Sequence, residues 1–134
     1  KKLNKTQVKY LIVCGLASIL YGVPRTTADI DITVMPTMGN LKKVITALKE
    51  LGLRPEIDDI TEIFGVGGTS FTNDWEIDML ADMELKDFEQ AWENKTIVEF
   101  KGVELYIIPK ALHIATLKRL GRAQNREDLR YLEE

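Results

Sequence analysis

The chain contains a short run in which acidic and apolar residues alternate, Ala28-Asp29-Ile30-Asp31-Ile32. Because side chains on a β-strand alternate between its two faces, Asp29 and Asp31 are expected to share one face, with the isoleucines on the other. Two like charges side by side repel, and a bridging cation is the simplest compensation. The ordinary alternative is a pair of acids on a solvated strand face, although aspartate is a poor strand former.

A third acid, Asp78, lies between Ile77 and Met79 in another alternating segment. If the two strands are neighbours, three carboxylates meet in one cleft. Three oxygen ligands without histidine or cysteine suit Mg²⁺, which keeps water molecules and takes further ligands from a substrate phosphate. Glu76 points the same way as Asp78 and is the rival third ligand.

The sequence signals for phosphate-binding residues are weaker than those for the metal ligands. Gly15 follows an apolar strand and precedes a helix, where backbone N–H groups favour anions, although the turn can need glycine only sterically. Arg25 precedes the aspartates at the same two-residue spacing and could bind phosphate in bidentate fashion or form a salt bridge with Asp29 or Asp31. A C-terminal basic group could face a triphosphate or form only a solvated helix face: Lys118, Arg119, Arg122 and Arg126.

Two other potentially reactive residues are predicted to pack rather than react. His113 is the single histidine and lies in an apolar helical stretch, and Cys14 lies beside a turn. A single cysteine excludes an internal disulfide and fits a reducing cytoplasm, which is the expected location. Acids in or beside turns are expected to be loop or cap residues: Asp58, Asp59, Asp74 and Asp82.

Length and charge limit the class of protein. The 134 residues are predicted to form one domain, 1–134, whose first residues have the composition of an N-terminal helix with an incomplete start. The net charge of −3 argues against non-specific coating of nucleic acid. No apolar run approaches the roughly 20 residues that cross a bilayer, so no membrane partner is expected.

Hydrophobic periodicity predicts alternating strands and helices. Strands are expected at 10–13, 27–35, near 63–64, and at 69–72, 75–80, 96–100 and 103–108. Helices are expected at 1–9, 17–21, 41–51, 85–92, 109–120 and 126–132, with a flexible segment at 65–68 and a turn at Asn73-Asp74. This order favours an α/β (or α+β) fold, with a central mixed β-sheet flanked by helices.

Taken together, these residues resemble the signature of the polymerase-beta-like nucleotidyltransferases, especially the small AbiEii-toxin-like and uncharacterised bacterial or archaeal members. That signature is an apolar strand, Gly-Gly or Gly-Ser, a helix, then G-x-x-R-x-T-x-D-h-D, and a third acid on a later strand. The matching residues are Cys14-Gly15-Leu16-Ala17, Gly22, Arg25, Thr27, Asp29-Ile30-Asp31 and Ile77-Asp78-Met79. The chain departs from the pattern at Cys14, where glycine is common, and at Asn125, where the C-terminal motif often has aspartate.

The resemblance implies the nucleotidyltransferase fold and the transfer of a nucleoside monophosphate from an NTP to a hydroxyl acceptor. By this resemblance Asp29 and Asp31 bind Mg²⁺, with two ions expected, and Asp78 completes the metal site and deprotonates the attacking hydroxyl. The nucleotide-binding residues would be Gly15, Arg25, Thr27 and Lys118.

The acceptor is left open between a small molecule, an RNA end and a protein, as for a toxin. The small chain leaves little room to bind an acceptor, which suggests a homodimer or a partner protein. The alternative is a non-catalytic nucleotide-binding or antitoxin-type module of the same fold.

Overall fold

The computed structural model describes residues 3, 7–73 and 76–133. Its strands are β1 (Tyr10–Val13), β2 (Asp29–Val34), β3 (Arg54–Pro55), β4 (Gly68–Thr72), β5 (Glu76–Leu80), β6 (Thr96–Phe100) and β7 (Val103–Ile107). Its helices are α2 (Cys14–Leu20), α3 (Met38–Glu50), α4 (Ile60–Val66), α5 (Leu85–Glu93), α6 (Lys110–Leu120) and α7 (Ala123–Leu132). The expected mixed α/β architecture is therefore confirmed.

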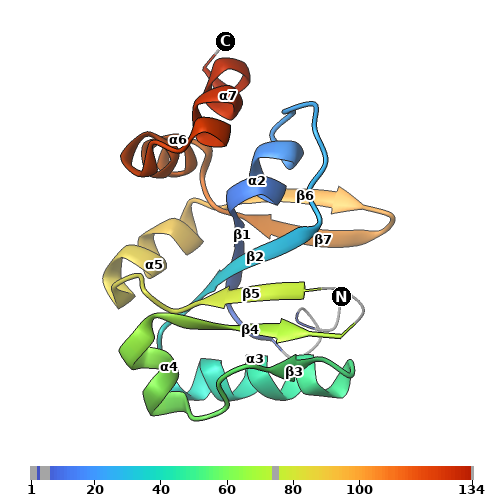
Figure 1. Ribbon diagram of the computed structural model, residues 1–134, viewed down its shortest axis with the longest axis vertical. Helices are drawn as coiled ribbons and strands as arrows, with labels where there is room; N and C mark the ends of the chain where they lie inside the picture. The colour runs from blue at the N-terminus through green and yellow to red at the C-terminus, as the bar shows by residue number, and fades with distance from the viewer. Residues whose placement is uncertain (1–2, 4–6, 74–75, 134) are drawn as a thin grey trace.

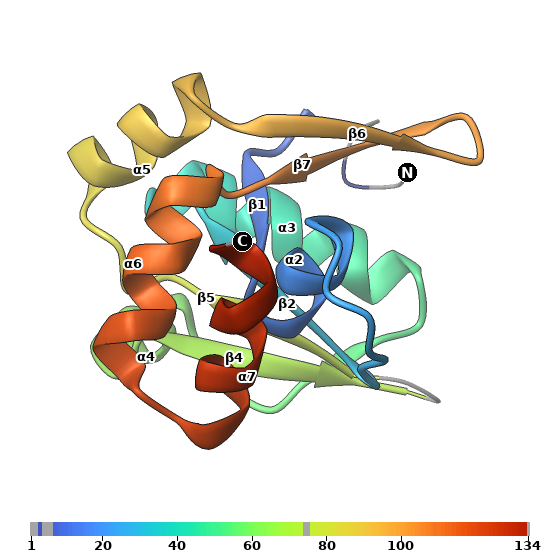
Figure 2. The same cartoon turned by 90° about the horizontal axis from the view of Figure 1, so that it is seen from above.

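All seven described strands form one sheet in the order β3-β4-β5-β2-β1-β7-β6. Strand β2 lies at its centre, antiparallel to β1 and parallel to β5. Figure 1 shows α3 and α4 near one end of the molecule and α6 and α7 near the other. Seen from above in Figure 2, α6, α7 and α2 gather over the β1–β2 region, and α7 contacts α6.

The alternation along β2 divides its side chains as the sequence predicts. Ile32 and Val34 are buried in the main apolar cluster, which also contains Leu41, Val44 and Leu48 of α3. The apolar face of β2 is thereby used by the core. The odd-numbered residues are left on the opposite face, toward α2, α6 and α7.

The prediction of a strand near Ile63-Phe64 is wrong, because these residues belong to α4. The side chain of Asp59 caps this helix by accepting from the backbone N–H of Glu62, and Gly67 ends it in the left-handed conformation. Ile60 and Ile63 are three residues apart, a helical spacing, and Ile63 is fully buried. The expected flexible segment at 65–68 is instead the end of α4 and the start of β4.

Two expectations fall partly outside the described residues: the helix at 1–9 and the turn at Asn73-Asp74. The helix prediction is wrong for its described end, because residues 7–9 are not helical and Gln7 has a φ of 57°. The last helix begins at Ala123, three residues earlier than expected. Over the described ranges, no helix combines the length and apolarity needed to cross a membrane.

Candidate active site

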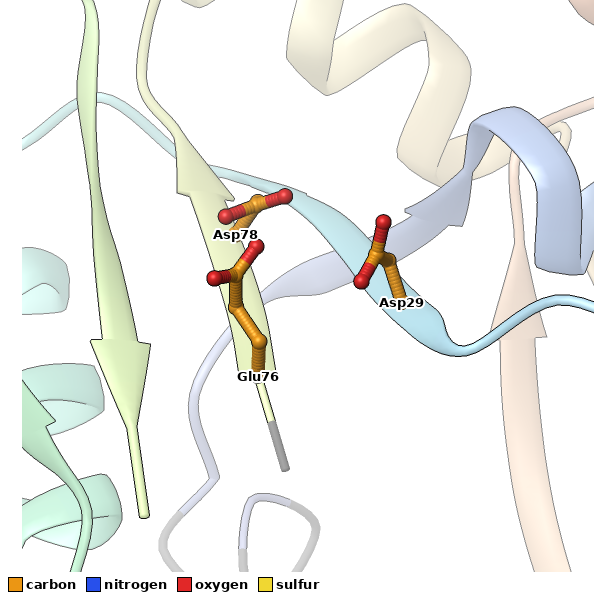
Figure 3. Close-up of side chains that lie close together, drawn as sticks. All are labelled: Asp29, Glu76 and Asp78. Atoms are coloured by element: carbon orange, nitrogen blue, oxygen red, sulfur yellow. The ribbon is translucent and has the colours of Figure 1, made fainter. Parts of the chain in front are cut away.

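Four carboxylates lie on one face of the sheet, where β2 and β5 run side by side. The parallel register places Asp29 opposite Glu76 and Asp31 opposite Asp78. One carboxylate oxygen from each of Asp29, Glu76 and Asp78 lies within 4.8 Å of the other two (Figure 3). The sequence offered Glu76 as an alternative to Asp78 for the third ligand. In the structure both carboxylates belong to the same group.

Asp31 lies against Asp78 and completes the group, which we call the carboxylate cluster (Asp29, Asp31, Glu76 and Asp78). Burial, a hydrogen bond with Asp78 and the neighbouring negative charges raise the pKa of Asp31 to about 6. The charge of Asp78 likewise raises the pKa of Glu76. On the other side, the Ser70 hydroxyl donates to Oδ1 of Asp78 at 2.6 Å. Within the cluster the negative charges repel one another.

The donor set of the carboxylate cluster fits a hard divalent cation. All ligands are oxygens, three of them are close enough to share one ion, and neither histidine nor cysteine belongs to the group. Mg²⁺ and Ca²⁺ prefer such ligands, whereas zinc is usually held by nitrogen or sulfur. A cation there would also offset the repulsion that raises the pKa of Asp31.

The turn between β1 and α2 lies next to the cluster and is closely packed. Cys14 has a φ of 58°, in the left-handed region that favours glycine. A Cβ on Gly15 would lie 3.0 Å from Nη2 of Arg25 and 3.3 Å from Oγ1 of Thr27. Glycine at position 15 therefore lets the segment before β2 approach the turn, which is the steric interpretation of this residue.

Arg25 forms a salt bridge, but with Asp128 of α7 and not with the aspartates of β2. Its Nε and Nη2 donate to the two carboxylate oxygens of Asp128, each at 2.9 Å. Gln124 donates to Oδ1 of the same carboxylate at 3.0 Å. Burial alone would raise the pKa of Asp128, but the hydrogen bonds from Arg25, Gln124 and Ser18 outweigh it, and the pKa lies below its usual range.

His113 and Cys14 both have environments that suit packing. His113 is 1% exposed, and its Nε2 lies 2.8 Å from the Ser18 hydroxyl. Burial lowers the pKa of His113 to about 4, so the ring is neutral near pH 7. Burial, together with the nearby charge of Asp31, raises the pKa of Cys14 to about 11, so its thiol stays protonated.

Two cavities open on either side of the carboxylate cluster. The inner cavity, of about 330 Å³, lies among α2, β2, α6 and α7, and Gly15, Arg25, Thr27, Asp29 and Asp31 form part of its wall. The outer cavity, of about 670 Å³, extends over β4 and β5 and includes Asp31, Glu76 and Asp78. Both cavities share six residues: Cys14, Asp31, Leu80, Asp82, Leu120 and Arg122.

Lys118 is placed differently from the other predicted nucleotide-binding residues. Its Nζ lies 2.6 Å from a carboxylate oxygen of Glu133, its side chain is 59% exposed, and it lines neither cavity. Arg122, in the same basic group, lines both. The sequence interpretation also missed Thr33 and gave Asp82 only a loop role, yet both line the inner cavity. The two-residue spacing from Asp31 could have indicated Thr33.

Solved structures match the fold over nearly the whole chain. Lincosamide antibiotic adenylyltransferase LnuA, bound to lincomycin, matches with a TM-score of 0.70 and 16% identity, covering 98% of this chain and 90% of that one. ANT(2'')-Ia in complex with adenylyl-2''-tobramycin matches with a TM-score of 0.67 and 15% identity, covering 98% and 81%. An antigenic nucleotidyltransferase-like protein from Paracoccidioides brasiliensis matches with a TM-score of 0.63 and 14% identity, covering 98% and 70%.

Comparison of the amino-acid sequence with protein-family models and with curated proteins finds no match. The structural likeness is one of fold. The chain has the nucleotidyltransferase fold, as the resemblance of its sequence predicted.

Proposed function

We propose that this protein is a nucleotidyltransferase that moves a nucleoside monophosphate from an NTP to a hydroxyl group of a small molecule, with Mg²⁺ as cofactor. The observation that carries the proposal is the carboxylate cluster, in which oxygens of Asp29, Glu76 and Asp78 converge within 4.8 Å on a nucleotidyltransferase fold. Pyrophosphate would be the second product.

The carboxylate cluster would hold the metal. Bound Mg²⁺ neutralises a triphosphate and stabilises charge on the attacking and leaving oxygens of an in-line displacement. Asp29, Glu76 and Asp78 have the closest oxygens, and Asp31 adds a fourth carboxylate for the two ions that the resemblance implies.

Asp78 is our candidate for taking the proton from the acceptor hydroxyl. It lines the outer cavity, and the hydrogen bond from Ser70 fixes one of its oxygens. A fixed orientation favours proton transfer in the transition state. The positive charge next to the phosphates is assigned to Arg122 in preference to Lys118, because Arg122 lines both cavities and Lys118 lines neither.

The outer cavity favours a small-molecule acceptor over an RNA end. Its wall includes the exposed acids Glu56 and Asp82 besides the carboxylate cluster, and these would repel the phosphates of RNA. The wall also includes apolar side chains, Val66 and Leu120 among them, and the basic side chain of Arg122. Two of the structural neighbours, one bound to lincomycin and one to adenylyl-2''-tobramycin, show that this fold accommodates small antibiotics.

The proposal is tested by calorimetry with each NTP and Mg²⁺, on the wild type and on an Asp29→Asn/Asp31→Asn variant. We expect the variant to lose Mg²⁺-dependent binding, by about tenfold or more, since each 1.4 kcal/mol is a factor of ten. The control is Asp58→Asn, an exposed acid that pairs with Lys49 and lines neither cavity. An unchanged NTP affinity in the double variant would contradict the proposed metal site.

Transfer is measured separately from binding. The protein is incubated with α-labelled NTP, Mg²⁺ and the small-molecule fraction of a cell extract, and labelled products are separated by chromatography. A labelled product that Asp78→Asn fails to make supports the transferase. Nucleotide binding without any labelled acceptor favours the non-catalytic nucleotide-binding or antitoxin-type module.

A further inference from the structure

Two buried polar side-chain atoms lack a hydrogen-bond partner in the described part of the chain, Oγ1 of Thr33 and Nδ2 of Asn125. Both residues line the inner cavity. Buried polar atoms are nearly always paired in folded proteins, so an unpaired one needs an explanation. That both lie on one cavity indicates a ligand with polar atoms of its own.

The two residues approach the inner cavity from different elements. Thr33 is 3% exposed and lies on β2, on the same face as Asp29 and Asp31. Strand geometry places it about 7 Å beyond Asp31 along β2. Asn125 belongs to the first turn of α7. Apolar residues also line this cavity, among them Val13, Ile108 and Leu117.

We propose that the inner cavity binds the base of the donor nucleotide, and that Thr33 and Asn125 determine which base is accepted. This inference rests on the proposed function. Asp29 and Asp31 line the same cavity and precede Thr33 along β2, so a nucleotide with its phosphates at the carboxylate cluster could extend its base toward Thr33. A volume of about 330 Å³ lies within the usual range of ligand pockets, about 300–1,000 Å³.

The chemistry of the two residues suits adenine, read at its N6/N7 edge. The faces of a base are apolar and match the apolar part of the wall, whereas its edge carries hydrogen-bonding atoms. An asparagine amide offers a donor beside an acceptor, which matches the neighbouring N7 acceptor and N6 donor of adenine. Guanine presents two acceptors, N7 and O6, at the same edge. A threonine hydroxyl can donate or accept and would pair with a further edge atom.

The test compares ATP, GTP, CTP and UTP by calorimetry in the presence of MgCl₂. We expect the wild type to prefer ATP. Thr33→Val keeps the shape of the side chain and removes only its hydroxyl, and Asn125→Leu removes the amide. Thr33→Val loses one hydrogen bond and is expected to weaken ATP binding about tenfold, whereas Asn125→Leu loses two and should weaken it more. Both variants should reduce the preference over the other three NTPs.

Controls separate this inference from the proposed function. Inorganic tripolyphosphate with Mg²⁺ has no base, so its affinity should be the same in wild type and both variants. Thr33→Ser keeps the hydroxyl and should keep the ATP preference, which guards against a mere packing defect. Thr46→Val, at an exposed site on α3, should change nothing.

The outcomes are distinct. If the wild type binds no NTP, the proposed function fails and this inference fails with it. If NTPs bind and both variants keep the wild-type preference, the assignment of the base to this cavity is overturned and the transferase proposal stands. An ATP preference that Thr33→Val and Asn125→Leu reduce, with unchanged tripolyphosphate affinity, supports the assignment.

Discussion

Two carboxylates of this small protein, Asp128 and Asp31, have opposite electrostatic environments. Asp128 accepts two hydrogen bonds from Arg25 and one from Gln124, and its pKa lies below the usual range. Burial raises the pKa of Asp31 to about 6, and the hydrogen bond with Asp78 and the neighbouring carboxylate charges act in the same direction. The first carboxylate is satisfied within the fold, and the second is not.

The difference separates a structural role from a functional one. The salt bridge between Arg25 and Asp128 joins the segment before β2 to α7, so it holds the wall of the inner cavity together. The carboxylate cluster gains nothing for the fold while it lacks a cation, because repulsion and burial both disfavour the charged form. Ionisable groups whose charge destabilises the free protein are expected at a binding site.

The largest expected change in the free energy of unfolding comes from removing the Asp128 carboxylate, which is fully hydrogen-bonded within the fold. Asp128→Ala leaves Arg25, Gln124 and Ser18 without their shared acceptor. Removing one partner of a buried pair typically costs 3–5 kcal/mol, and we expect about 3 kcal/mol here, since Arg25 keeps some exposure to water. Urea denaturation followed by circular dichroism measures the change.

The matched control is Asp58→Ala. Asp58 pairs with Lys49 at 2.8 Å, but both side chains are exposed, so the expected loss is below about 1 kcal/mol. Equal losses in the two variants would contradict a structural role specific to the Arg25–Asp128 pair.

The carboxylate cluster was largely predictable from the sequence, and the Arg25–Asp128 pair was not. Alternation with a period of two places Asp29 and Asp31 on one face whatever the rest of the fold does. The parallel pairing of β2 with β5 then brings Asp78 and Glu76 together. Asp128, by contrast, lies 103 residues from Arg25, and no local pattern connects them.

The end of helix α6 accounts for a further difference between the sequence prediction and the structure. Lys118 and Arg122 are four residues apart, but Gly121 ends α6 in the left-handed conformation between them. The chain therefore turns, and Arg122 alone lines the cavities while Lys118 pairs with Glu133. Such a choice among neighbouring cations depends on the path of the backbone at one glycine, which spacing alone does not specify.

An intermediate change in the free energy of unfolding is expected from neutralising Asp31 in the carboxylate cluster. A raised pKa means that the folded protein binds more protons than the unfolded chain between pH 3.8 and about 6. The stability contributed by Asp31 therefore falls as pH rises through this window and stays low above it. Asp31→Asn lacks this penalty and should be more stable than wild type by about 1–2 kcal/mol at pH 8 without metal, after allowance for partial exposure.

Denaturation of wild type and Asp31→Asn at pH 4 and pH 8 measures this difference. Titration of groups outside the carboxylate cluster, including His113, cancels in the comparison. The gain should nearly vanish at pH 4, where the carboxyl of the wild type is itself largely neutral. A gain of the same size at both pH values would show that repulsion is not its source. Added MgCl₂ should raise the melting temperature of wild type more than that of the variant.

The smallest expected effect concerns Cys14, at the edge of the carboxylate cluster. With a φ of 58°, Cys14 has a backbone conformation that costs a non-glycine residue about 1–2 kcal/mol. Cys14→Gly relieves this strain but adds about 0.5–1 kcal/mol of unfolded-chain entropy and loses the packing of a half-buried thiol, so we expect a net gain of only a few tenths of a kcal/mol.

Lys101 provides the comparison for Cys14, because it has a φ of 51° in the exposed β6–β7 turn. Lys101→Gly relieves the same kind of strain without losing a buried contact, so it should be the more stabilising of the two changes in thermal unfolding. The difference between the two variants then measures how much the thiol contributes by packing against the cluster. If Cys14→Gly instead stabilises more than Lys101→Gly, the thiol is itself strained against Asp31, and the cluster destabilises its surroundings by crowding as well as by charge.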